Sequence, residues 1–222
     1  MTIENKRIKI DCKDVFHAFL VEKANYEGIE EIPCIKTSKL IPARVITFSK
    51  AISSKDYNQW IVFYEYDENF IRLWNNPRKY LPIIKKYEGI VTPDFSLYRN
   101  MPLVMQKWST YQGKAIGVWL QNNGVEVIPN VRFSDERSYD FCFDGIEKNS
   151  TVCIGTHGCI KNLIERKYFE QGLSKMVERL TPKKIIVYGA APDDIFKKYK
   201  ELGIQIIQFD SEYASVHKEK IS

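Results

Sequence analysis

The sequence predicts an α/β protein with a mainly parallel sheet and flanking helices. From residue 89 onward, segments with strand character alternate with amphipathic helical segments. Residues 184–210 have the order strand, helix, strand, and such a crossover places its two strands parallel in one sheet. The runs "IIV" and "QIIQF" in this unit are almost continuously apolar, which is typical of strands covered on both faces.

Two architectures fit this order of elements, a barrel-like (β/α) arrangement and an irregular open sheet. Five strand–helix alternations follow two earlier candidate strands, which suits a barrel that is complete or lacks a unit. The chain of 222 residues is shorter than the roughly 250 of a typical barrel. No GxGxxG motif follows a strand, so the dinucleotide-binding form of the open sheet has no support. These observations slightly favour the barrel-like form.

The first half of the chain is the less regular part. We expect residues 1–56 to form an N-terminal extension packed on the core and residues 57–222 to form the α/β domain. Apolar residues at helical spacing follow Asp14, and the β-branched and aromatic segments "ARVITFSKA" and "QWIVFYEYD" predict strands. Pro77 is suited to begin a helix that Gly89 ends.

The second half gives a strand or a helix at each step. Asn100 can cap a long helix, although Gly113 and Gly117 leave a break into two helices open. Pro182 ends a later helix, and Asp193 can cap the last one. The expected strands are "GIV", "VEVIPNV", "YDFCF", "STVCIGT", "KKIIVYGA" and "IQIIQFD", and the expected helices are 100–120, 162–180 and 193–202.

Composition limits the class of protein. There are 33 Lys and Arg against 28 Asp and Glu, a net charge of +5, which is a smaller excess than a dedicated nucleic-acid-binding domain usually has. No apolar run approaches the roughly 18 residues of a membrane span, and the first residues do not resemble a signal peptide. We therefore expect a cytoplasmic protein without membrane association. Its five cysteines are then free thiols: Cys12, Cys34, Cys142, Cys153 and Cys159.

The predicted fold also indicates where a site should lie. In parallel α/β folds, ligands bind at the carboxyl ends of the strands, where loops and helix N-termini meet. The residues that follow the predicted strands there are polar or small. We predict Asp94, Asp144 and His157 as acid–base catalysts. The predicted ligand-binding residues are Asn130, Arg132, Thr156, Gly158, Tyr188 and Asp210.

Simpler roles remain open for several of these residues. Asp94 follows a proline and can cap a turn, and Asp144 belongs to the common turn dipeptide Asp–Gly. Arg132 can pair with an acidic neighbour at the surface. The cysteines and the histidine between residues 142 and 159 have a composition that zinc accepts, but their spacing lacks a CxxC pair. We predict no metal site, and no cofactor can be assigned.

Four separated motifs resemble one known family. The segments "GIVTPDFSLYRNMP", "GVEVIPNVRFSDERSYDFCFDGI", "VCIGTHG" and "IIVYG" are together similar to domain of unknown function 4417, found in prophages and other mobile elements. The resemblance covers residues 57–210. It implies an origin in phage or mobile-element biology and supplies no reaction and no catalytic residues.

Three functions remain open at this stage. The first is a ligand pocket, in an enzyme or a binding protein. Its ligand would be an anionic small molecule that bears a phosphate or resembles a sugar. The second is DNA or RNA binding as an accessory of a mobile element, and the third is binding of a host protein. Polar residues gather at strand ends whereas basic residues are spread along the chain, and this favours the pocket.

Overall fold

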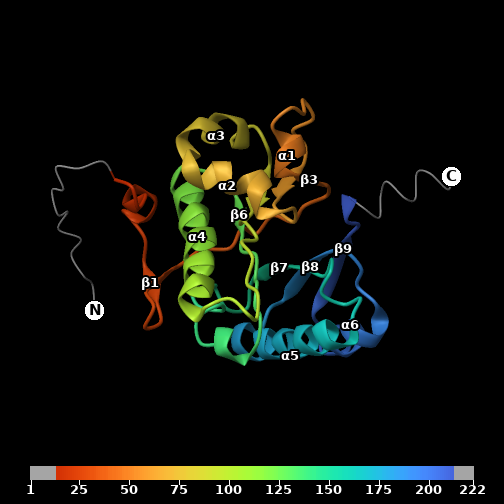
Figure 1. Ribbon diagram of the computed structural model, residues 1–222. Coiled ribbons are helices and arrows are strands. Elements are labelled where there is room, and N and C mark those ends of the chain that lie inside the picture. Colours follow the sequence, from red (N-terminus) through yellow and green to blue (C-terminus); the bar gives the residue numbers. More distant parts are fainter. Residues whose placement is uncertain (1–13, 213–222) are drawn as a thin grey trace.

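Within residues 14–212, seven parallel strands form the centre of the structure (Figure 1). The structure is a computed structural model, and it describes residues 14–212. One sheet has the order β3-β4-β5-β6 and a second has the order β7-β8-β9, with every neighbouring pair parallel. The strands are β3 (Val45–Thr47), β4 (Trp60–Val62), β5 (Gly89–Val91), β6 (Val127–Ile128), β7 (Thr151–Gly155), β8 (Lys184–Tyr188) and β9 (Gln205–Phe209).

The two sheets meet just beyond β6. Asn130 forms a parallel bridge to Cys153 in β7. The Val131 N–H donates to the Cys153 carbonyl at 2.8 Å, and the Cys153 N–H donates to the Pro129 carbonyl at 2.9 Å. The seven strands therefore follow one another in chain order around a common surface.

The inner face of these strands packs on itself, as in a barrel. Alternate strand residues point inward and form one apolar cluster that contains no helix residue. The rings of Tyr64, after β4, and Tyr188, in β8, stack at 4.8 Å although three strands separate them along the sheet order. In an open sheet, helices would cover this face instead. The inward-facing residues are Val45, Trp60, Val62, Tyr64, Val91, Ile128, Cys153, Ile186, Tyr188, Ile207 and Phe209.

The barrel is open between its first and last strands. Within residues 14–212, no strand pairing joins β3 to β9. A side chain links this edge instead, since the Thr47 hydroxyl donates to the Glu212 carboxylate at 2.5 Å and Lys50 Nζ lies 3.3 Å from the same carboxylate. The fold class predicted from the sequence is confirmed, in its barrel-like form.

Helices cover the outer face of the strands (Figure 1). Outward residues of β4 to β6 pack in one core with the helices up to α4, and those of β7 to β9 pack in a second core with α5 and α6. The connection from β6 to β7 contains only a 3-10 turn, η2 (Glu136–Ser138). The helices are α1 (Phe48–Ala51), α2 (Asp67–Asn75), α3 (Pro77–Ile84), α4 (Leu103–Asn122), α5 (Leu163–Leu180) and α6 (Asp193–Glu201).

Helix α4 is continuous through both of its central glycines. A Cβ on Gly113 would lie 2.9 Å from the Pro93 carbonyl oxygen, and one on Gly117 would lie 2.7 Å from the Thr92 methyl group. These glycines thus allow α4 to approach the end of β5 closely. The break that the sequence left open does not occur.

The segment before β3 packs on the outer side of α4 (Figure 1). It holds a 3-10 turn, η1 (Ala18–Val21), and a short antiparallel hairpin of β1 (Tyr26–Glu27) and β2 (Ile32–Pro33). Leu20 belongs to the same apolar core as α2, α3 and α4. The boundary expected near residue 57 falls between β3 and β4, which are adjacent parallel strands.

The expected strand 139–143 is wrong. After η2 the chain makes a series of turns, in which the Cys142 N–H donates to the Ser138 carbonyl and the Asp144 N–H donates to the Phe141 carbonyl. Because the backbone is satisfied locally, it does not pair with a strand. Phe141 and Phe143, which suggested a strand, are nevertheless buried in the core that includes α5, and Tyr139 packs against this core.

Within residues 14–212, no helix has the length and apolar character needed to cross a membrane. Cys34, Cys142, Cys153 and Cys159 are free thiols, and Cys12 lies outside the described residues.

Candidate functional site

A hydrogen-bonded network joins the carboxyl ends of β4, β5 and β6. The Asn130 side-chain amide donates to Asp94 Oδ1 at 2.7 Å, and its oxygen accepts from the Tyr64 hydroxyl at 2.8 Å. Arg132 Nη1 lies 3.3 Å from Asp94 Oδ2. The Asn130 N–H donates to the Thr92 hydroxyl at 2.8 Å. Three strands therefore fix one arginine and one carboxylate in a defined arrangement.

Local sequence explains this arrangement. Asn130 and Arg132 are two residues apart on an extended segment, so their side chains lie on the same side of it. The bridge from Asn130 to β7 sets the register of that segment. Asp94 follows β5 by three residues and faces both side chains because β5 and β6 are parallel neighbours.

Burial dominates the electrostatics of the Asp94–Arg132 pair. The Asp94 side chain is 11% exposed and that of Arg132 is 28% exposed. Loss of solvent raises the pKa of the Asp94 carboxyl, while Arg132 and the Asn130 amide partly lower it again. The carboxylate in turn raises the pKa of Arg132 above its usual value. The guanidinium therefore keeps its charge beside a carboxylate that holds it in place.

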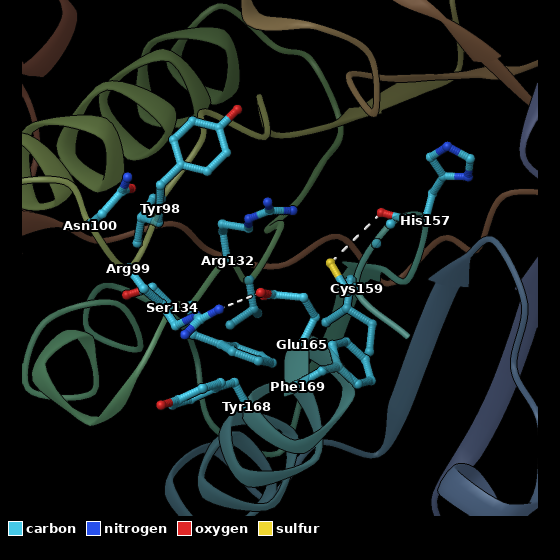
Figure 2. Close-up of a pocket in the computed structure, with 16 residues that line it drawn as sticks. Tyr98, Arg99, Asn100, Arg132, Ser134, His157, Cys159, Glu165, Tyr168 and Phe169 are labelled. Carbon is cyan, nitrogen blue, oxygen red and sulfur yellow. Dashed lines mark hydrogen bonds and ion pairs between the residues drawn. The ribbon is translucent and has the colours of Figure 1, made fainter. Parts of the chain in front are cut away.

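A pocket of about 610 Å³ opens next to Arg132 (Figure 2). In the figure, Arg132 lies between Tyr98 on one side and the turn that carries His157 and Cys159 on the other. Asp94 is not part of the lining, so the pair presents its cationic member to the pocket. The lining combines this cation with an apolar surface from the strand ends and α5. Its apolar residues are Leu97, Val131, Phe133, Ile154 and Phe169.

One wall of the pocket is formed by the Arg99 guanidinium, which lies over the phenol ring of Tyr168. The Arg99 guanidinium carbon lies 4.2 Å from the centre of the Tyr168 ring. Arg99 also pairs with Glu165, one turn before Tyr168 on α5. Glu165 and Tyr168, the two partners of Arg99, lie in the first turns of α5. The N-cap of this helix is Asn162, whose side chain accepts from the Ile164 N–H at 2.8 Å.

The opposite wall is a tight turn after β7. The Cys159 N–H donates to the Thr156 carbonyl, and Gly158 has φ +79°, which suits the third position of a type II turn. The turn contributes the exposed residue His157 to the lining, and Figure 2 shows its imidazole directed away from Arg132. The buried Thr156 hydroxyl donates to the Ala190 carbonyl at 2.8 Å. A Cβ on Gly155 would lie 2.8 Å from the Tyr64 ring, so this strand end requires glycine.

The structure brings together most of the residues that the sequence singled out. Arg132, His157 and Gly158 line the pocket. Asp94 contacts Arg132 directly, and Asn130 contacts Asp94; both belong to the hydrogen-bonded network next to the pocket. Tyr188 stacks on Tyr64 and is the fourth strand end connected to the network.

The other predicted residues lie apart from the pocket. Thr156 faces the loop after β8, and the exposed Asp210 follows β9 outside the pocket lining. Asp144 does not follow a strand, which corrects the expectation for this residue. Its carboxylate is bonded to Arg179 Nη2 at 2.9 Å. Arg179 is in the last turn of α5, which leads to the amino end of β8, so Asp144 lies on the far side of the barrel.

Several residues of the network and of the pocket were not predicted. Tyr64 is two residues beyond Val62 and continues its inward alternation, a signal that was present in the sequence. Arg99, Glu165 and Tyr168 lie in a loop and on the polar side of α5, where the same residue types usually face solvent. Only the folded arrangement identifies them.

The thiols near the site are not activated nucleophiles. Burial raises the pKa of Cys159, and it raises the pKa of Cys153 to about 12. Each sulfur is therefore protonated at neutral pH, although thiolates are the reactive form. Among residues 14–212, no group of three His, Cys, Asp or Glu side chains is placed to hold a metal ion.

Comparison with known proteins identifies the family. The model of the family described as "Domain of unknown function (DUF4417)" matches residues 24–210. The chain therefore belongs to this family, and the match begins earlier than the resemblance at residues 57–210 suggested.

Two relatives come from phages. The chain is 32% identical over 163 residues to the Gene 1 protein of Mycobacterium phage L5, with 72% of this chain and 71% of that protein covered. It is 29% identical over 163 residues to the Gene 1 protein of Mycobacterium phage D29, with 72% and 60% covered. No solved structure matches the chain.

Proposed function

We propose that this member of a phage-associated family binds a phosphate-bearing small molecule in the pocket beside Arg132 and acts on it as an enzyme. One observation carries the proposal: a guanidinium fixed by a buried carboxylate borders a pocket of about 610 Å³ at the carboxyl ends of parallel strands. This end of such folds is where ligands bind. The volume is within the range of small-molecule sites, roughly 300–1,000 Å³.

The geometry of Arg132 suits a phosphate. A guanidinium has five N–H donors in one plane, and Asp94 engages Nη1 of this one. The remaining donors are available to the oxygens of an anion, which arginine binds in a bidentate manner. Asp94, itself held by Asn130, fixes the Arg132 side chain before a ligand arrives, so little conformational entropy is lost on binding.

The roles of the other predicted residues follow from their positions. His157 belongs to the pocket lining, and we assign the acid–base role of the proposed reaction to it. Its imidazole is turned away from Arg132 in Figure 2, so this role requires a rotation of the side chain. Asp94 acts through Arg132 as a positioning residue. Asp144 has no part in the reaction because it lies on the far side of the barrel with Arg179.

Isothermal titration with ribose 5-phosphate tests the proposal. We expect Arg132→Met to weaken binding at least about 10-fold, since charge-assisted hydrogen bonds are lost. The matched control is Arg44→Met, because Arg44 also pairs with an aspartate, Asp56, at 2.9 Å but is outside the pocket. The control should bind like the unaltered protein.

Two results would contradict the proposal. One is ribose 5-phosphate binding that survives Arg132→Met unchanged, and the other is no binding by the unaltered protein at millimolar ligand. A steep loss of affinity for DNA or RNA with added salt would instead favour the nucleic-acid alternative.

A further inference from the structure

We infer that the ligand of this pocket is a nucleotide, whose base stacks on the wall formed by Arg99 and Tyr168 while its phosphate meets Arg132. The inference rests on the proposed function, since it assigns the phosphate to Arg132. It adds a second recognition element, a planar ring, for which the structure has a separate set of residues.

Several contacts hold Arg99 over Tyr168. The guanidinium lies 4.2 Å from the Tyr168 ring centre, and Glu165 pairs with it from the same helix. The Arg99 carbonyl accepts from Arg137, whose guanidinium is bonded to Asp135 at 2.8 Å. Backbone and side chain of Arg99 are therefore both anchored. Figure 2 shows the interaction of the side chain with Glu165.

The two arginines of the pocket consequently offer different chemistry. Glu165 forms an ion pair with Arg99, and the Arg99 guanidinium lies over the Tyr168 ring. Nucleobases stack on planes of this kind, aromatic or guanidinium. Arg132 borders the pocket without an aromatic ring over its plane among the described ring contacts, and it is held by a single carboxylate through one nitrogen. Arg99 thus suits a base and Arg132 suits an anion.

The size and lining of the pocket agree with a ligand larger than a phosphate or a sugar phosphate. Five of the lining residues have aliphatic or phenylalanine side chains, and a phosphate contacts none of these favourably. A volume of about 610 Å³ leaves room for a bicyclic base and a ribose besides the phosphate. Apolar walls with a few fixed polar groups are the usual composition of such sites.

Titrations with AMP and ribose 5-phosphate separate this inference from the proposed function. We expect AMP to bind about 10-fold more tightly than ribose 5-phosphate, because the base adds a stacking contact. Tyr168→Leu should lower the affinity for AMP to that for ribose 5-phosphate, and it should leave the affinity for ribose 5-phosphate unchanged. Tyr168→Phe keeps the ring and should keep the affinity for AMP. Melting temperatures of both variants establish that they are folded.

The outcomes point to different conclusions. If ribose 5-phosphate binds through Arg132 but AMP binds no better, the nucleotide is excluded and the proposed function stands. If neither phosphate binds, the proposed function fails as well. If Tyr168→Leu is folded and retains full affinity for AMP, the inference that the base stacks on the Arg99–Tyr168 wall is wrong. An eight-residue oligoadenylate that binds more tightly than AMP would assign the site to a nucleic-acid chain and overturn a free nucleotide.

Discussion

Replacement of Lys114 by methionine should stabilise the protein and remove part of its pH dependence. Lys114 is on α4 and is 3% exposed, and its Nζ has no hydrogen-bond partner among the described residues. Burial lowers its pKa to about 7, although Cys142, Cys34 and the two nearest carboxylates partly oppose the shift. The carboxylates are Asp144 and Glu27.

The magnitude follows from the two pKa values. The unfolded chain keeps the proton up to its ordinary pKa of 10.5, whereas the folded protein releases it near pH 7. Between these values the unfolded state binds more protons, so stability rises with pH. At pH 7 the buried amine costs about 4 kcal/mol, and between pH 7 and pH 8.5 this cost falls by about 1.5 kcal/mol. Methionine has a similar length and no titratable group.

Urea denaturation of both proteins at pH 7.0 and pH 8.5 measures the effect. We expect Lys114→Met to be more stable at both values, with the larger gain at pH 7. Lys197→Met serves as the control, since the Lys197 side chain is 73% exposed, and its stability should change alike at both pH values. A gain for Lys114→Met that is independent of pH, or a loss of stability, would refute the argument that burial lowers the pKa of this amine.

Two further substitutions test the remaining structural claims. Arg179→Met should destabilise the protein by about 2 kcal/mol in urea, since Asp144 stays buried without its cation, yet leave ribose 5-phosphate affinity unchanged; a loss of that affinity would place Asp144 in the site after all. Gly155→Ala should cost about 2 kcal/mol in the same measurement, because its Cβ would lie 2.8 Å from the Tyr64 ring; a variant as stable as the unaltered protein would mean that the barrel interior is looser than the structure indicates.

Strand and helix periodicity predicted the second half of the fold well, since local signals there agree with the tertiary arrangement. The units around β8 and β9 have apolar strands and helices close to the expected bounds, and α5 ends before Pro182. Asp193 was expected to cap the last helix, but it lies in the first turn of α6 and the N-cap is Pro192. Segment 139–143 was predicted as a strand because it is rich in aromatic residues. These residues pack in the core, but the backbone that carries them forms successive turns. Neither hydrophobicity nor β propensity distinguishes that case from a short buried strand.

The candidate site was predictable only where it depends on topology. Asp94, Asn130 and His157 were found because they follow parallel strands, and these ends must converge. Asp144 failed with the strand that was expected to carry it. Arg99 and Tyr168 meet across 69 residues of chain through a loop and a helix start, which no local pattern encodes.

A crystal structure of the protein with AMP tests the central claim most directly, because it locates the anion. We expect the phosphate oxygens within about 3 Å of the free Arg132 nitrogens, with the Asp94 contact intact. Nucleotide bound away from Arg132, or a chain in which Asn130 does not bridge Cys153 and the strand ends diverge, would contradict a ligand site at this end of the barrel.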